Sequence, residues 1–347
     1  MIKNIRLQSQ QLVAPAFKSP KDLVSWMGAI QGQDYRMVKW ALGIRLKEGT
    51  LSRVDEALQR GEIIRTHILR PTWHLVMPED IRWMIMLTGK RIKAAWGSAD
   101  KQLEIDEELL AKCNCTLEKI LEGNKHLTKQ ELMQELEKAG IKTNEHRINR
   151  ITLAAEADGI LCSGAERYKK HTYALLEERV PRAKELHKDE ALAKLAGQYF
   201  QSHSPATLND FVWWSGLPIT EARKAIDFIK CDLVTEKTDS VDFYIHRVYS
   251  NAPQADDIIH LMPPYDEYLI SYKDRTAVLD KEHHPKAFTN YGIFYPVILY
   301  NGKIVGNWKK IVKKGEISID ASPFDKNFKF DKKLMREAEE RYKKFLL

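Results

Sequence analysis

The stretch TKQELMQELEKAGIKTNEHRINRITLAAEADGI, residues 128–160, decides the fold. It opens with Thr128, and Glu131 follows three residues later, which is the pattern of a helix capping box. A glycine turn then separates the first helix from a second helix, which leads into a short strand. The strand continues into a two-stranded ribbon whose basic tip carries Lys169 and Lys170. A helix-turn-helix followed by a ribbon predicts a winged helix.

The same order of elements occurs on both sides of this stretch. Upstream, residues 20–31 predict an amphipathic helix, a second helix begins after Gly32, and a third spans residues 53–59. Residues 61–76 are rich in β-branched side chains and predict another ribbon. Downstream, residues 190–248 repeat the helices and the ribbon. We therefore expect an α+β protein that begins with three tandem winged-helix units.

After Pro253 the sequence alternates between apolar and polar residues, as is typical of strands. The turn Tyr300-Asn301-Gly302-Lys303 predicts a tight hairpin. We expect a small C-terminal β-barrel, closed by a terminal helix. The predicted domains are a first winged helix that holds the candidate active site, a second, a third, and the barrel, at residues 1–100, 101–182, 183–252 and 253–347.

Composition excludes several classes of protein. Of the 347 residues, 44% are hydrophobic and 30% are charged, which is typical of a globular chain and not of a disordered one. No stretch has the apolar length of a signal peptide or a membrane helix, so we expect a cytoplasmic, nucleoid-associated protein. Four cysteines form no zinc-binding pattern, and we expect reduced thiols, with no metal and no cofactor.

Charge is unevenly distributed along the chain, whose net charge is +7. Residues 1–100 contain 16 basic and 9 acidic side chains, and residues 301–347 contain 13 and 7, so the residues between carry a net −6. Two basic ends favour a shared anionic partner, and nucleic acid is the commonest such partner of a basic protein. Solvated lysine-rich helices explain the same count without any partner.

Two amides near the amino terminus, Gln31 and Gln33 in AIQGQDY, are the candidate catalytic residues. If Gly32 ends the preceding helix, Gln31 lies on its last turn and Gln33 at the entry to the next helix, which Asp34 caps. Two amides can orient a water at any physiological pH. That suffices for hydrolysis of an N-glycosidic bond to a cationic alkylated purine, because the base leaves neutral. The alternative is that both amides are structural caps.

A second candidate stretch is RPTWHL, residues 70–75. On an extended strand Arg70, Thr72 and His74 point to one face, which would then be polar and cationic. Arg and Thr side chains hold phosphates, and a histidine adds a donor near a reacting sugar. A hydrogen-bonded structural histidine is the competing interpretation of His74.

In combination, IQGQDY, RPTWHLVMPEDIRWM, LMPPYDEYLISYKDR and VGNWKK resemble the winged-helix DNA-binding family that contains the AlkZ and YcaQ DNA glycosylases. This resemblance covers nearly the whole chain and implies three winged helices and a barrel. It also implies removal of N7-alkylated purines and, in the AlkZ branch, unhooking of interstrand crosslinks. The family's Gln-aliphatic-Gln motif matches Gln31 and Gln33, and implies that they position water and stabilise the transition state. Gly32 stands where the family has an aliphatic residue.

The resemblance also bears on residues outside the glutamine pair. Arg70, Thr72 and His74 match the family's Arg-x-Thr-x-His stretch, which makes them candidates for the DNA-facing surface. Asp266 and Arg275 match the barrel motif, where we expect a structural salt bridge or turn. The remaining candidate DNA-binding residues are basic side chains on the second unit and on the barrel: Arg147, Arg150, Lys169, Lys170, Lys309 and Lys310.

The leading hypothesis is a monomeric, monofunctional DNA glycosylase that acts on damaged double-stranded DNA. One rival is a non-catalytic winged-helix DNA-binding protein or regulator, which would read bases with the polar side chains of residues 144–150. Another is a protein-interaction scaffold, which accounts for the acidic middle of the chain and leaves the basic ends without a partner.

Overall fold

A computed structural model describes residues 1–238, 240–249 and 257–347. Asp239 lies outside the described residues, as do residues 250–256, where the predicted domain boundary at residue 252 falls. Two compact units are formed, and each is described by itself. One contains residues 1–55, 193–214 and 218–347, and the other residues 56–192 and 215–217. The division into four domains remains a prediction.

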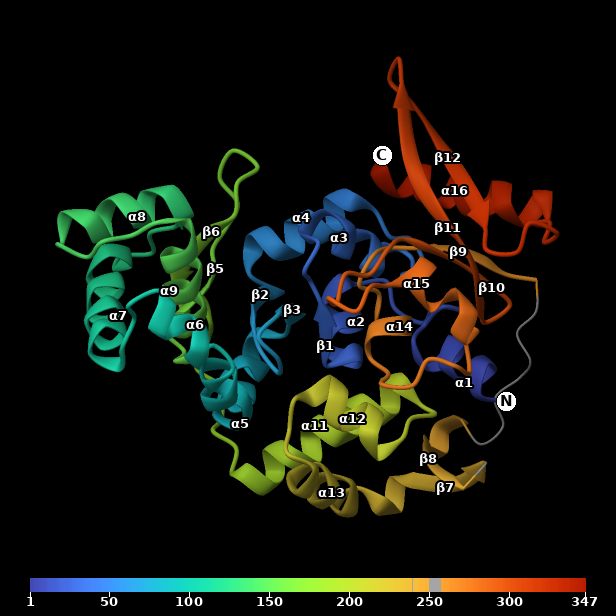
Figure 1. The fold of residues 1–347 in the computed structure, drawn as a ribbon, viewed down its shortest axis with the longest axis horizontal. Coiled ribbons are helices and arrows are strands. Elements are labelled where there is room, and N and C mark those ends of the chain that lie inside the picture. Colours follow the sequence, from blue (N-terminus) through green and yellow to red (C-terminus); the bar gives the residue numbers. More distant parts are fainter. Residues whose placement is uncertain (239, 250–256) are drawn as a thin grey trace. The chain divides into compact units, whose positions relative to one another are not determined.

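The first unit combines helices from the beginning of the chain with helices and strands from its second half (Figure 1). Its elements are the helices α1 (Ile2–Ser9), α2 (Pro20–Met27), α3 (Tyr35–Gly43), α11 (Lys188–His203), α12 (Leu208–Ser215), α13 (Ile219–Phe228), α14 (Glu267–Ile270), α15 (His284–Ala287) and α16 (Lys332–Leu346), and the strands β1 (Ala29–Gln31), β7 (Leu233–Thr238), β8 (Val241–His246), β9 (Ile259–Met262), β10 (Val297–Tyr300), β11 (Lys303–Lys313) and β12 (Glu316–Pro323).

Strands β9 to β12 form an antiparallel sheet in the order β12-β11-β10-β9. The predicted hairpin between β10 and β11 is confirmed, and its turn residues Asn301 and Gly302 take φ values of 46° and 81°. The predicted barrel is wrong for the described residues, because the edge strands β9 and β12 do not pair with each other. Helix α16 packs against both edge strands, so the sheet is covered and stays open.

Aromatic side chains join the last helix to the first part of the chain. On α16, Tyr342 contacts Trp40 of α3 and Trp308 of β11, with ring centroids 5.0 and 5.2 Å apart, both edge to face. Phe345 also packs on Trp40 and fills the space beside Gly43, where a Cβ would lie 2.3 Å from its ring. Residue 43 is therefore restricted to glycine, and α3 is fixed by the end of the chain.

The second unit holds the helical stretch with which the sequence analysis began. Its elements are the helices α4 (Leu51–Arg60), α5 (Ile81–Ala94), α6 (Gly97–Gln102), α7 (Glu107–Leu121), α8 (Lys129–Lys138), α9 (Glu145–Ala157) and α10 (Leu176–Arg179), and the strands β2 (Ile64–His67), β3 (Trp73–Val76), β4 (Leu127–Thr128), β5 (Leu161–Ser163) and β6 (Thr172–Leu175). Strands β5 and β6 form the predicted ribbon, with β4 on the other edge of β6.

Local signals in this stretch are confirmed. The Thr128 hydroxyl accepts from the Glu131 N–H, and the Glu131 carboxylate accepts from the Thr128 N–H at 2.7 Å, so both halves of the capping box are present. Gly140 takes a φ of 75° between α8 and α9. Helices α7, α8 and α9 bury one core of leucine and isoleucine side chains. The elements are those of a helix-turn-helix with a ribbon, and the name winged helix remains an interpretation.

Short 3₁₀ helices lie between these elements, at Pro78–Asp80, Lys230–Asp232, Arg247–Tyr249 and Lys281–His283. Among the described residues, no helix has the length and the apolar composition needed to cross a bilayer.

Candidate active site

Gln31 lies on strand β1, which corrects the expectation that it lies on the last turn of a helix. Helix α2 ends four residues earlier, at Met27, because Gly28 takes a φ of 73° that side-chain-bearing residues rarely adopt. The apolar residues after Gly28 are buried. In the sequence they extend the apolar pattern of the helix, although the helix itself ends before them. Gly28, and not Gly32, is therefore the helix terminator.

The two glutamines differ in exposure. Gln31 is 5% exposed and Gln33 is exposed to solvent. Asp34 caps α3 as predicted, and its carboxylate accepts from the N–H groups of Arg36 and Met37 at 3.1 and 3.0 Å. The connection from β1 to α3 thus fixes one buried amide and presents one amide to solvent.

A buried carboxylate holds the backbone of Gln31. The Gln31 N–H donates a short hydrogen bond to Glu267 Oε1, although 236 residues separate the two in sequence. The Ser271 hydroxyl also donates to this carboxylate, Trp214 Nε1 donates at 3.3 Å, and His203 Nε2 lies 3.4 Å away. Glu267 is 1% exposed. The sequence did not single out Glu267 as a candidate site residue. The only signal at its position was the family-like stretch PPYDEYLISY, which contains it.

The charge of Glu267 follows from these contacts. Burial by itself would raise the pKa of the Glu267 carboxyl, but the His203, Ser271 and Gln31 contacts outweigh it and hold the pKa below its usual range. Burial lowers the pKa of His203, whose Nδ1 lies 2.7 Å from the Ser202 hydroxyl. At neutral pH the group is therefore an ionised glutamate beside a neutral histidine.

The neighbouring carboxylate, Asp266, forms a second buried pair. Its two oxygens accept from the Arg45 guanidinium at 2.8 and 2.7 Å, a bidentate geometry. Gln10 accepts from the same guanidinium through its side chain and its carbonyl, each at 3.0 Å. Arg275 instead donates to the Leu269 carbonyl at 2.8 Å. The expected structural roles of Asp266 and Arg275 are confirmed, with Arg45 as the salt-bridge partner.

Arg70, Thr72 and His74 do not lie on one strand face, which corrects the second expectation. The chain turns at Leu69, whose φ is 62°, and the N–H groups of Arg70 and Thr72 donate to carbonyls two residues back. Only His74 lies on strand β3, and it is fully buried, with Nδ1 2.9 Å from the Thr72 carbonyl. The structure therefore favours a structural role for His74, and leaves Arg70 and Thr72 partly exposed in the turn.

Two predicted DNA-binding arginines of α9 make internal contacts. Arg150 is 2% exposed, and its guanidinium is paired with both oxygens of Asp100. Arg147 donates to the carbonyls of Leu103, Glu104 and Lys142. Arg150 thus holds α6, and Arg147 holds the α6–α7 connection and the residues before α9, so neither guanidinium is free of internal contacts and their role in DNA binding stays a prediction.

The predicted lysines lie at exposed positions. Lys169 and Lys170 are on the β5–β6 tip, where Arg167 and Lys170 exchange backbone hydrogen bonds of 3.2 and 2.9 Å. Tyr168, which sequence analysis passed over, is 92% exposed at this tip. Figure 1 shows the tip extending beyond the helices of its own unit.

The hairpin of β11 and β12 carries Lys309 and Lys310, and it projects from the first unit (Figure 1). Both lysines are exposed, and Lys309 Nζ lies 3.2 Å from Asp320 of the facing strand. Of these two lysines, Lys310 is thus the one whose charge has the better access to an anion.

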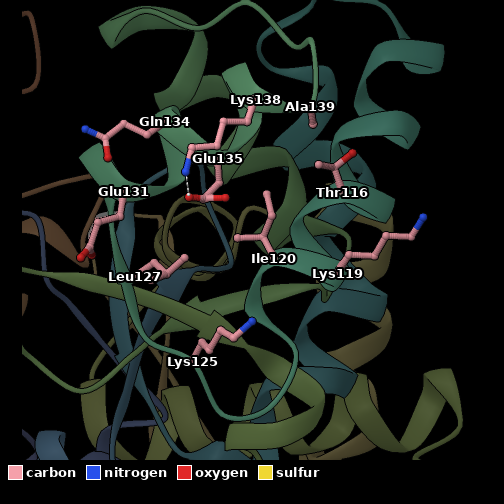
Figure 2. Close-up of a pocket in the computed structure, with 10 residues that line it drawn as sticks. All are labelled: Thr116, Lys119, Ile120, Lys125, Leu127, Glu131, Gln134, Glu135, Lys138 and Ala139. Carbon is pink, nitrogen blue, oxygen red and sulfur yellow. Dashed lines mark hydrogen bonds and ion pairs between the residues drawn. The ribbon is translucent and has the colours of Figure 1, made fainter.

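An open groove of about 720 Å³ lies between α7 and α8 (Figure 2). Its acids are engaged, since Glu131 belongs to the capping box and Glu135 pairs with Lys138 at 2.7 Å. None of the candidate catalytic residues lines it. The four cysteines are free thiols, and the described part of the chain has no cluster of three potential metal-ligating side chains.

Comparison with known proteins identifies relatives over most of the chain. The family model "DNA glycosylase AlkZ-like" matches residues 24–345. A curated protein of Streptomyces sahachiroi, "Interstrand DNA cross-link repair glycosylase", is 25% identical over an aligned length of 329 residues, and the match covers 88% of this chain and 85% of that protein. The solved structure of Streptomyces sahachiroi DNA glycosylase AlkZ has a TM-score of 0.81 at 19% identity, and the match covers 99% of this chain and 95% of that one.

Proposed function

Because the chain belongs to the AlkZ-like DNA glycosylase family, we propose that it hydrolyses the N-glycosidic bond of N7-alkylated purines in double-stranded DNA. The observation that carries this proposal is the Gln31–Gln33 pair on the β1–α3 connection, with Gln31 held by an ionised buried carboxylate. The name of the Streptomyces relative extends the proposal to purines that are crosslinked to the opposite strand.

The proposed reaction needs positioning and little proton transfer. The oxygen of a water attacks C1′ of the deoxyribose, the C1′–N9 bond breaks, and its electron pair neutralises the positive charge of the alkylated purine. No general acid is required, because the alkylated purine leaves as a neutral base, and the attacking water loses its proton to solvent. The amides of Gln31 and Gln33 orient the water and stabilise the developing charge on the sugar. Gln33 is exposed, which supports a direct contact with the substrate in this proposal.

Lysines on two projecting ribbons are the proposed phosphate contacts. Lys169 and Lys170 lie on the β5–β6 tip, and Lys309 and Lys310 lie on the β11–β12 hairpin. Phosphate contacts position a protein on DNA without reading its sequence, which suits an enzyme that recognises damage. With each such contact, the affinity for DNA should fall more steeply as the salt concentration rises.

The rival function, a regulator that reads bases with α9, loses its main support. Arg147 and Arg150 are engaged in internal contacts, and Asn144 caps α9 by accepting from the N–H groups of His146 and Arg147. These side chains are therefore occupied in holding the helix, and direct readout of base edges requires free donors and acceptors.

Single-turnover release of 7-methylguanine from a methylated duplex tests the proposal. We expect the Gln31→Ala, Gln33→Ala double variant to lose release while its DNA affinity stays the same. Gln130→Ala, at an exposed glutamine of α8, is the matched control and should leave release unchanged. Absence of release by the wild-type protein, despite tight DNA binding, would exclude this lesion as a substrate and restore the regulator hypothesis.

A further inference from the structure

We infer that Glu267 is a positioning residue, which fixes the side chain of Gln31 by holding its backbone N–H. This inference rests on the proposed function of Gln31 as a water-orienting residue. Glu267 itself is 1% exposed and touches no solvent-facing surface of the site, so it acts through Gln31 and not on the substrate.

The contacts of Glu267 come from three other elements and from Ser271, the residue that follows its own helix. The three elements are β1 through Gln31, α11 through His203 and α12 through Trp214. A carboxylate bound from several directions has little freedom to rotate, so the N–H that it accepts is fixed with respect to the core. Rotation or translation of β1 would break a short, charge-assisted hydrogen bond in a buried site.

Asp266 fixes the other end of the same segment. The β1–α3 segment begins at Gln31, which Glu267 holds, and α3 is followed by Arg45, which Asp266 holds. All four residues of the short helix α14 are buried, and two adjacent carboxylates at its start therefore anchor both ends of residues 31–45. This arrangement explains how Gly32 can lack a side chain between the glutamines. The packing that an aliphatic residue would contribute is replaced by a hydrogen bond to the backbone.

Catalysis by positioning is sensitive to small displacements. A shift of about 1 Å in a positioned group can cost on the order of 10²-fold in rate. Glu267→Gln keeps the length of the side chain and one oxygen acceptor, and removes the charge and one acceptor for the Ser271 and Trp214 donors. We therefore expect Glu267→Gln to lower single-turnover release by about 10- to 100-fold, with DNA affinity unchanged within about twofold.

A double-variant cycle separates positioning from a general structural effect. If Glu267 acts through the Gln31 side chain, Glu267→Gln should lower release in the wild-type background and have no further effect in the Gln31→Ala background. Equal proportional losses in both backgrounds would overturn the inference. Gln31→Ala measured alone reports on the proposed function, because an unchanged rate in that variant contradicts the role of Gln31 whatever Glu267 does.

A second measurement does not depend on activity. Hydrogen–deuterium exchange of the peptide that contains residues 29–34 should be faster in Glu267→Gln than in the wild type, because the Gln31 N–H loses its charged acceptor. Unchanged exchange would contradict the proposed hold of Glu267 on the Gln31 N–H, even if the enzyme had no measurable release. Should Glu267→Gln fail to fold, Ser271→Ala removes one donor from the carboxylate and should give a smaller change of the same sign in both measurements.

Discussion

Each unit of the molecule buries a carboxyl group beside a histidine, and the pKa values of the two carboxyls are shifted in opposite directions. In the first unit Glu267 is bound by groups from three other elements and by Ser271, and its pKa lies below the usual range. In the second unit Glu156 of α9 lies within hydrogen-bonding distance of His67 of β2. Burial raises the pKa of Glu156, and the His67 contact does not outweigh it. The pKa of a buried glutamate is therefore lowered where several donors converge, and raised where burial dominates.

The difference corresponds to two roles. Glu267 holds the segment that carries the glutamines, whereas Glu156 joins two elements of the core, α9 and β2. Burial already disfavours the charged form of Glu156, so a neutral amide should replace this carboxyl at low cost. An ionised Glu267 leaves several donors unsatisfied when it is removed, and its loss acts on the backbone of Gln31. Four predictions test this contrast, and they are ordered by the size of the expected effect.

The largest effect is on stability. Glu267→Ala should lower the free energy of unfolding by about 3–5 kcal/mol, as observed when one partner of a buried charged group is removed. Glu156→Ala should cost about 1–3 kcal/mol, because its removal leaves mainly one hydrogen-bonding partner, His67, unsatisfied. Urea denaturation followed by tryptophan fluorescence measures both values. Equal losses in the two variants would contradict the contrast between the two sites.

The second effect is on activity. Glu267→Gln should reduce single-turnover release by about 10- to 100-fold, because it disturbs the backbone of Gln31. Glu156→Gln should stay within about twofold of the wild type, because Glu156 and its hydrogen-bonding partner His67 both belong to the other unit. A loss of similar size in both variants would mean that release reports only the integrity of the core.

The third effect is on the pH dependence of stability, and its sign differs between the two sites. Glu267 has a folded pKa of about 2, so its stabilising contribution is present above the unfolded pKa of about 4.3 and is lost as pH falls towards 2. Glu156 has a raised folded pKa, so its contribution is present below the unfolded value and is lost as pH rises through the folded value. Unfolding free energies of the two glutamine variants, measured against wild type across this range, should differ with opposite slopes.

The smallest effect is on salt-dependent DNA binding by the two ribbons. Lys169→Ala, Lys170→Ala should lower the slope of log K against log salt by about 2 if both lysines contact phosphates. Lys309→Ala, Lys310→Ala should lower it by less, because Lys309 is already paired with Asp320. Fluorescence anisotropy on an undamaged duplex gives both slopes. Equal reductions would show that the Asp320 contact does not compete with phosphate.

Local chemistry made much of the fold predictable. The capping box at Thr128, the glycine at residue 140 and the Asn301–Gly302 turn each specify a backbone geometry within a few residues, and each was confirmed. The glutamine pair was found in the same way, from residue type and spacing, and its catalytic role is still a prediction.

Long-range contacts could not be predicted in this way. Alternation predicted the strands of the C-terminal sheet but not whether β9 and β12 pair, since closure depends on α16. Periodicity placed Gln31 on a helix, because the residues after Gly28 are apolar whether they form a helical turn or a buried strand. The sequence favoured a contact between Arg150 and DNA, because it does not show that Asp100, 50 residues away, pairs with this guanidinium.

The distance in sequence between Gln31 and Glu267 has a consequence for how the protein is made. A ribosome must add 236 residues after Gln31 before the acceptor of its N–H exists. Helix α16, whose Tyr342 packs on Trp40 of α3, emerges later still. Residues 56–192, by contrast, include most of one unit and can fold while synthesis continues. A nascent chain therefore carries its glutamines well before it can hold the Gln31 N–H in this way, which becomes possible only after Glu267 has been added.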